Sequence, residues 1–131
     1  MQYVALIAHD DKKDDIIELA ARHREILARE ALVATKTTGA NIERATGLQV
    51  VMMLSGPLGG DLQIGALIAT DQVKAVIFLR DPLTPHPHEP DISALMKVCD
   101  THNVPLTTNL ATAELIIRHI DETNRQVESR V

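Results

Sequence analysis

Five short apolar segments, separated by stretches of helical periodicity, constrain the fold of this chain more than any other feature of its sequence. Most of them are continuously apolar rather than alternating, which is typical of strands buried on both faces of a parallel sheet. The five segments are YVALIA (3–8), ALVA (31–34), LQVVMML (48–54), AVIFL (75–79) and VPLTT (104–108). We therefore expect five strands, each followed by a helix.

Apolar residues at helical spacing fill the intervals between these segments and follow the last one. The predicted helices cover Asp11–Arg29, Gly39–Thr46, Asp61–Thr70, a segment from Pro90 through Cys99, and Ala111–Ile120. The repeated strand–helix order predicts one α/β domain over residues 1–131, with a three-layer α/β/α fold and a mainly parallel five-stranded sheet. We expect the last ten residues, which are polar, to fray or to dock on a neighbour.

Composition excludes several classes of protein. With 45% hydrophobic and 24% charged residues the chain is expected to be globular and soluble. A net charge of -5 and only 2% aromatic residues argue against a nucleic-acid partner. We see no basic leader of a signal peptide and no apolar run near the roughly 20 residues of a membrane span. The single Cys99 fits a reducing compartment, so we expect a cytoplasmic protein without a membrane partner.

Chemically unusual residues follow each of the predicted strands. They are HD (9–10), TKTTG (35–39), SGPLGGD (55–61), RDPLTPHPHEPD (80–91) and TTN (107–109). The carboxyl ends of parallel strands meet at one edge of the sheet, which is where open α/β sheets bind ligands. The sequence therefore predicts a site at that edge.

One set of these residues suits a phosphate group. They are hydroxyl residues and glycines at turns leading into predicted helices, where anions bind: Thr35, Thr37, Thr38, Gly39, Ser55 and Gly56. Lys13, at the start of the first predicted helix, could add a positive charge. Helix caps and tight turns are the alternative interpretation, since Ser and Thr are ordinary N-caps. Neither a Walker A nor a GxGxxG pattern is present, so no nucleotide is predicted.

A second set consists of acids and histidines. The carboxylates are Asp10, Asp61, Asp81 and Asp91, and the histidines are His9, His86 and His88. Clustered carboxylates raise one another's pKa and can divide into acid and base roles. For His9 and His88 the alternative is a loop histidine held by hydrogen bonds, and we expect His23 and His102 on helix surfaces.

A metal site is the rival interpretation of the loop after the fourth predicted strand. Its plausible ligands are His86, His88, Glu89 and Asp91. No HExxH motif or cysteine pair accompanies them, and Pro85, Pro87 and Pro90 are expected to hold the loop extended. We therefore expect no metal.

Seven segments together resemble the methylglyoxal synthase family. They are ALIAHD with Lys13, TTG, ATGLQV, SGPLGGD, RDPL, PHEPD and TNLATAE, and the match runs in register from about residue 3 to residue 117. The resemblance implies conversion of dihydroxyacetone phosphate into methylglyoxal and inorganic phosphate, without a metal or an organic cofactor. It also implies a homohexamer that phosphate inhibits.

The resemblance further implies roles for individual residues. Asp61 would be the base that removes a proton next to the substrate carbonyl, a task that needs a tuned carboxylate. His88 would handle protons on the substrate oxygens, and His9 and Asp10 would line the carbonyl side.

The remaining positions implied by the resemblance support the chemistry or bind phosphate. Asp81 and Asp91 would orient His88 and set the pKa of Asp61. The implied substrate- and phosphate-binding residues are His9, Lys13, Thr35, Thr37, Thr38, Ser55, Gly56 and His88.

The chain departs from the family pattern at two positions. The family usually has Gly at the position of Lys36; if that glycine is left-handed, Lys costs about 1–2 kcal/mol. Otherwise Lys36 crowds the phosphate or adds a charge beside it. At Leu62 the family usually has Gln, whose hydrogen bond near Asp61 is then lost. The family's arginine from a neighbouring subunit has no convincing match among Arg118, Arg125 and Arg130.

Two other functions stay open at this point. Domains of the same fold that are fused to larger enzymes bind phosphorylated effectors without catalysis. Against this function, the sequence has no attached domain up to residue 131 and carries all the acids and histidines. The third interpretation is a metal hydrolase built on the loop from His86 to Asp91.

Overall fold

Five strands form one sheet in which every pairing is parallel. The computed structural model of the chain describes residues 1–55, 59–84 and 92–129. Its strands are β1 (Tyr3–Ala8), β2 (Ala31–Thr35), β3 (Val51–Met53), β4 (Val73–Leu79) and β5 (Leu106–Thr107). Their order across the sheet is β3-β2-β1-β4-β5. The predicted parallel five-stranded sheet is confirmed.

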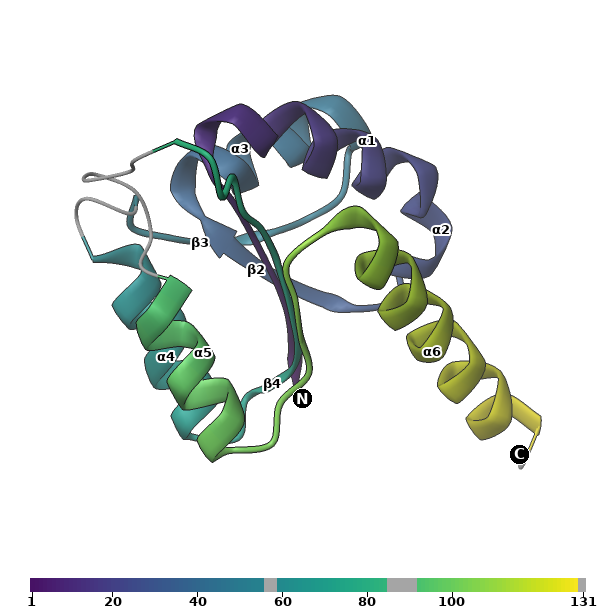
Figure 1. Ribbon diagram of the computed structural model, residues 1–131. Coiled ribbons are helices and arrows are strands. Elements are labelled where there is room, and N and C mark those ends of the chain that lie inside the picture. The colour runs from purple at the N-terminus through teal and green to yellow at the C-terminus, as the bar shows by residue number, and fades with distance from the viewer. Residues whose placement is uncertain (56–58, 85–91, 130–131) are drawn as a thin grey trace.

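Helices cover both faces of this sheet, which gives the predicted three layers (Figure 1). They are α1 (Lys13–Arg22), α2 (Arg24–Leu27), α3 (Lys36–Thr46), α4 (Gly60–Ala69), α5 (Ile92–Thr101) and α6 (Leu110–Ser129). One apolar cluster joins α1, α2, α3 and α6 to the sheet, and a second joins α4 and α5 to the opposite face. Because the chain changes face after β3, strands β1 and β4 become neighbours at the centre. Such a switch point is where open α/β sheets form their ligand crevice.

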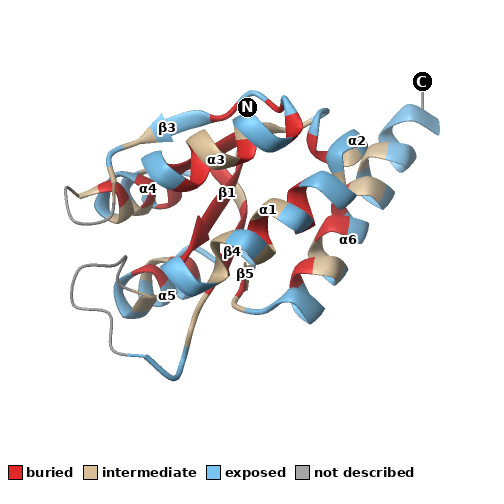
Figure 2. Cartoon of the chain, turned by 90° about the horizontal axis from the view of Figure 1, so that it is seen from above, coloured by how far each residue is buried: buried red, intermediate tan, exposed pale blue. Residues whose placement is uncertain are grey.

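The central strand β1 explains why the apolar segments are continuous. Val4, Leu6 and Ala8 enter one cluster, while Ala5 and Ile7 enter the other, so each side chain is buried (Figure 2). Successive residues of a strand point to opposite faces, and both faces of this strand are covered.

The edge strand β3 is shorter than the segment 48–54 that was predicted as a strand. Only Val51–Met53 pair with β2, and Val51 remains 46% exposed. The apolar residues before it, Leu48 and Val50, are buried in the core without belonging to a strand. At the other edge, β5 likewise occupies only Leu106–Thr107 of the expected segment 104–108.

Helix α3 begins at Lys36, three residues earlier than expected, so TKTTG is not a loop. Thr35 ends β2 and is at the same time the N-cap of α3. Gly39 therefore lies inside the helix rather than in a turn. A Cβ atom at this position would lie 2.9 Å from Cγ of Met52, so the glycine lets α3 pack closely on β3.

The first predicted helix, Asp11–Arg29, is broken into three parts. A 3₁₀ turn (Asp10–Lys12) precedes α1, and α2 follows a break at His23, where φ is -111° and ψ is 28°. Non-helical backbone at one residue is enough to redirect the chain, and apolar spacing alone does not reveal such a break.

The last helix, α6, continues to Ser129 instead of ending near Ile120. Its polar end docks on the turn between α2 and β2: Nδ2 of Asn124 donates to Glu30 at 2.9 Å, and Arg29 lies 3.6 Å from Glu128. Of the two alternatives for the tail, fraying does not apply to its described part, because polar contacts hold it. Within the described ranges, none of the helices combines the length and apolar character needed to cross a bilayer.

Candidate active site

His9 and Asp81 meet at the switch point of the sheet. His9 follows β1 directly and Asp81 lies two residues after β4, so pairing of these strands brings them together. The backbone N–H of Asp81 donates to Nδ1 of His9 at 2.9 Å. His9 is only 4% exposed, and its ring meets the edge of Phe78 with centroids 5.2 Å apart. Because Nδ1 accepts a hydrogen bond, the neutral ring carries its proton on Nε2.

The carboxylate of Asp81 shapes the turn that follows β4. Its Oδ1 accepts a hydrogen bond from the N–H of Leu83 at 3.0 Å, which is a local side-chain turn. Asp81 therefore contributes its backbone to His9 and its side chain to the turn.

Lys13 joins three elements at the same edge. Its Nζ lies 3.0 Å from the carbonyl oxygen of Ala8, 3.3 Å from Oγ1 of Thr38 and 3.6 Å from Oδ1 of Asp10. The side chain of Lys13 is 20% exposed, whereas that of Asp10 is 76% exposed. The ammonium group is thus held between the end of β1 and the first turn of α3.

The amino end of α3 supplies the other groups that suit an anion. Thr35 is buried at the N-cap position but makes no side-chain capping hydrogen bond, so the ordinary cap interpretation does not hold for its hydroxyl. Thr38 is buried and Thr37 is exposed. The first turn contains no acidic residue, and its N–H groups have no intrahelical acceptors.

Asp61 lies in the first turn of α4, after two glycines with different tasks. Gly59 has a φ of +99°, which favours glycine. At Gly60 a Cβ atom would lie 1.8 Å from the carbonyl oxygen of Leu54 and 3.1 Å from Cγ2 of Thr35. Close approach at Gly60 therefore brings the backbone next to Asp61 against the end of β2.

Ser55 braces this same turn through its backbone. Its carbonyl oxygen accepts from the N–H of Gly60 at 3.0 Å, and its side chain is half-buried.

Neither departure from the family pattern strains the described backbone. Lys36 is the exposed first residue of α3, and among the described non-glycine residues only Asp71 and Asn103 have a positive φ. Of the two alternatives for Lys36, left-handed strain therefore does not apply. Leu62 is 71% exposed, and its neighbour Gln63 accepts a hydrogen bond from the N–H of Leu54 at 2.7 Å.

Several predicted residues lie outside the described part of the chain. They are Gly56, His88 and Asp91 of the candidate site, His86 and Glu89 of the metal alternative, and Arg130. Among the residues that are described, no group of three or more His, Cys, Asp or Glu could hold a metal ion. Burial, with a smaller contribution from Asp100, raises the pKa of the Cys99 thiol to about 11, which makes it a poor nucleophile.

Two basic residues have contacts or surroundings that the sequence did not predict. Arg80 lies between β4 and Asp81, and among the described residues its buried Nε has no hydrogen-bond partner. His23, expected on a helix surface, contacts Glu114 of α6 at 2.6 Å. The break between α1 and α2 positions His23, and no pattern of residues signals that break.

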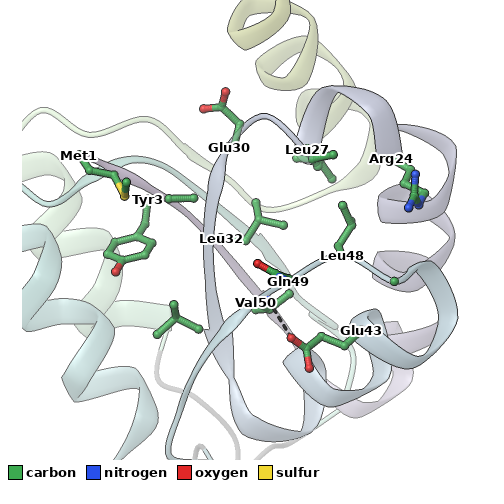
Figure 3. Close-up of a pocket in the computed structure, with 14 residues that line it drawn as sticks. Met1, Tyr3, Arg24, Leu27, Glu30, Leu32, Glu43, Leu48, Gln49 and Val50 are labelled. Atoms are coloured by element: carbon green, nitrogen blue, oxygen red, sulfur yellow. Dashed lines mark hydrogen bonds between the residues drawn. The ribbon is translucent and has the colours of Figure 1, made fainter.

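A cavity of about 730 Å³ lies at the amino ends of β1 and β2, away from the carboxyl edge of the sheet (Figure 3). Tyr3 at the start of β1 and the Glu43 side chain, which accepts from the N–H of Val50 at 2.9 Å, are among its lining residues. No residue of the candidate site lines this cavity, so the predicted carboxyl edge remains the candidate site.

Comparison with known proteins gives one consistent family. The model of the MGS-like domain matches residues 15–108. A protein from Cupriavidus metallidurans named methylglyoxal synthase is 65% identical over 114 residues, covering 87% of this chain and 81% of the relative. One of the same name from Carboxydothermus hydrogenoformans is 60% identical, covering 92% of this chain and 100% of the relative. The crystal structure of methylglyoxal synthase from Elizabethkingia anophelis has a TM-score of 0.85 and 42% identity, covering 88% of this chain and 76% of that one.

Proposed function

The chain belongs to the methylglyoxal synthase family, and from that premise we propose that it converts dihydroxyacetone phosphate into methylglyoxal and inorganic phosphate. This makes it a carbon–oxygen lyase that acts on a phosphate ester. The structural observation that best supports this proposal is the hydrogen bond from the Asp81 N–H to Nδ1 of His9. It directs the proton of the neutral ring to Nε2, where it can be donated to an oxyanion.

The reaction begins with Asp61, which we assign as the base. It removes a proton from the hydroxymethyl carbon next to the substrate carbonyl, and the electron pair passes to the carbonyl oxygen as an enediolate. Asp61 suits this role because it lies in the first turn of α4, fixed by the packing of Gly60. Holding base and carbon acid in one geometry supplies much of the rate.

The oxyanion then needs hydrogen-bond donors. We assign Nε2–H of His9 as one donor, with Asp10 beside it, and His88 as the group that exchanges protons on the substrate oxygens. Asp81 and Asp91 support this set. A buried, oriented donor stabilises developing charge better than water does.

Collapse of the enediolate breaks the bond between carbon and the phosphate oxygen. Inorganic phosphate leaves with the electron pair, and the remaining enol takes up a proton to become methylglyoxal. The leaving group would be held by Lys13 and the first turn of α3, with Thr35, Thr37, Thr38, Ser55 and Gly56 around it. The Lys13–Thr38 contact of 3.3 Å supports this placement, since it fixes a cation beside a helix N-terminus.

The resemblance supplies further parts of the proposal. We propose a homohexamer in the cytoplasm, inhibited by phosphate, that needs no metal or organic cofactor.

Direct assay tests the proposed function. The protein is incubated with dihydroxyacetone phosphate, and methylglyoxal and phosphate are measured with and without a chelator. We expect equal amounts of both products and no effect of the chelator. Binding without turnover would point to an effector domain, and turnover lost on chelation would point to a metal hydrolase.

Asp61→Asn tests the assigned base. Loss of a general base lowers turnover by about 10²–10⁴-fold, and we expect a loss in this range with substrate binding retained. The matched control is Asp100→Asn, which changes an exposed carboxylate on α5. An Asp61→Asn protein that turned over nearly as fast as the control would end the assignment.

A further inference from the structure

A small cavity lies beside β4 and β5 at their carboxyl ends, between the start of α1 and the start of α6. It has a volume of about 120 Å³. Its polar lining comes from Lys12, Asp15, Arg80, Thr108 and Asn109. None of these residues belongs to the proposed catalytic or phosphate-binding set.

Arg80 is the unusual member of this lining. Its Nε is buried, and within the described part of the chain it has no hydrogen-bond partner. A guanidinium group carries five N–H donors, and leaving a buried donor unpaired is costly. The geometry therefore places a cationic side chain with one unpaired buried N–H donor at the wall of the cavity.

The rest of the lining leaves this positive charge largely uncompensated. The ammonium of Lys12 lies 3.9 Å from the carboxylate of Asp15, so two cations face one anion. The cavity also borders the amino end of α6, where Oδ1 of Asn109 accepts from the N–H of Thr112 at 3.1 Å. Helix amino ends favour negative charge.

We propose that this cavity binds a small tetrahedral oxyanion, such as inorganic phosphate, through Arg80 and Lys12. Its volume corresponds to about four water molecules at roughly 30 Å³ each, which suits five heavy atoms. A planar guanidinium fork matches two phosphate oxygens, so Arg80 suits this ligand. The site would be distinct from the one at Lys13. It adjoins Asp81, whose N–H orients His9, so an anion here would act on the segment that positions that ring.

Counting bound phosphate tests the proposal without relying on turnover. Equilibrium dialysis with radiolabelled inorganic phosphate is expected to find two sites per chain. Arg80→Met is expected to remove one of them, and Lys13→Met the other. Arg44→Met, which changes an exposed arginine on α3, serves as the matched control and should retain both. If the phosphate site assigned to the enzyme is wrong, Lys13→Met will not change the number of bound phosphates, but Arg80→Met still will. If the Arg80 site is wrong, Arg80→Met will not change that number, so the two outcomes are distinguishable.

Unchanged phosphate stoichiometry and affinity in a folded Arg80→Met protein would overturn the proposal. An Arg80→Met protein with a changed native mass but unchanged phosphate binding would also overturn the proposal. That result would mean that a carboxylate of a second copy of the chain fills the cavity. If Arg80→Met does not fold, Lys12→Met decides the matter. Loss of one charged contact should weaken the Arg80-dependent site about tenfold, and wild-type affinity would contradict it.

Discussion

At the scale of single residues, the glycines of SGPLGGD show how strongly one position can be restricted. A Cβ atom added at Gly60 would collide with the backbone of Leu54. At Gly65, five residues later on α4, the only atom near an added Cβ in the described part of the chain is Cδ2 of Leu95, at 3.9 Å. The same residue type is therefore indispensable at one position and replaceable at the other. The difference lies in what surrounds the missing Cβ atom.

Alanine at these two positions gives a matched pair of variants. We expect Gly60→Ala to lower the free energy of unfolding by about 1–3 kcal/mol or more, because the Cβ collides with the Leu54 carbonyl group. Turnover should fall too, since Asp61 follows directly. Gly65→Ala should raise the free energy of unfolding by about 0.5–1 kcal/mol, because alanine suits a helix interior better than glycine. Urea denaturation measures both, and equal effects of the two variants would contradict the packing argument.

At the scale of elements, α6 is held to the rest of the molecule by charged contacts as well as apolar ones. Its Glu114 forms ion pairs with both Arg22 and His23, at the break between α1 and α2. Near the end of α6, Asn124 donates a hydrogen bond to the carboxylate of Glu30 at 2.9 Å. The same carboxylate pairs with the ammonium of Lys74 at 2.7 Å. These contacts explain why a polar helix of 20 residues stays docked.

The Glu114 contacts predict a pH dependence of stability. Burial raises the pKa of Glu114, but hydrogen bonds and charge from His23 and Arg22 outweigh it, so the pKa in the folded protein is lowered. A lowered pKa contributes stability above the unfolded value of about 4.3, and this contribution is lost as the pH falls through the folded value.

Glu114→Gln is therefore expected to lower the urea midpoint at pH 7, where the carboxylate is charged. The difference in urea midpoint between Glu114→Gln and the wild type should shrink as the pH falls below about 4. Glu114 of the wild type is then protonated in the folded as well as in the unfolded protein and loses its charge. Glu122→Gln, at an exposed position on the same helix, is the control and should leave the midpoint unchanged at either pH. A Glu114→Gln effect of equal size at pH 7 and pH 3 would show that the ion pairs are not its source.

At the scale of the whole molecule, the edge of the sheet formed by β3 exposes apolar side chains to solvent. On the edge strand β3, Val51 is 46% and Met52 36% exposed, and Leu54 just beyond it is 47% exposed. An exposed apolar edge strand invites pairing with another chain. This edge is our candidate for a contact between subunits of the proposed hexamer.

Native mass measurement by analytical ultracentrifugation tests the assembly. We expect six times the chain mass of 14.4 kDa. Val51→Lys should reduce this mass, since a charged lysine on an edge strand opposes pairing. Leu115→Lys changes a 62% exposed residue on α6 and should leave the mass unchanged. Monomeric wild-type protein, or a Val51→Lys protein of full mass, would contradict this prediction.

Much of the architecture could be read from the chain because it depends on local patterns. Continuous apolar segments such as 3–8 and 75–79 can be buried on both faces only within a covered sheet, so they indicated parallel strands and two layers of helices. The grouping of polar residues after these strands predicts the site at the carboxyl edge of the sheet. Family motifs such as SGPLGGD then specified the chemistry.

Tertiary structure decided what depends on contacts between distant segments. The start of α3 at Lys36, the break at His23 and the docking of α6 through Glu114 and Asn124 have no signal in local spacing. The same holds for the pairing of His9 with Asp81, 72 residues apart. Local sequence sets which residues prefer a strand or a helix, but the partner of a buried donor or acceptor is fixed only when the strands lie side by side. For that reason the sequence alone determined the sheet and the family, whereas only the folded chain determined the hydrogen bond that orients His9 and the buried Nε of Arg80, which has no partner among the described residues.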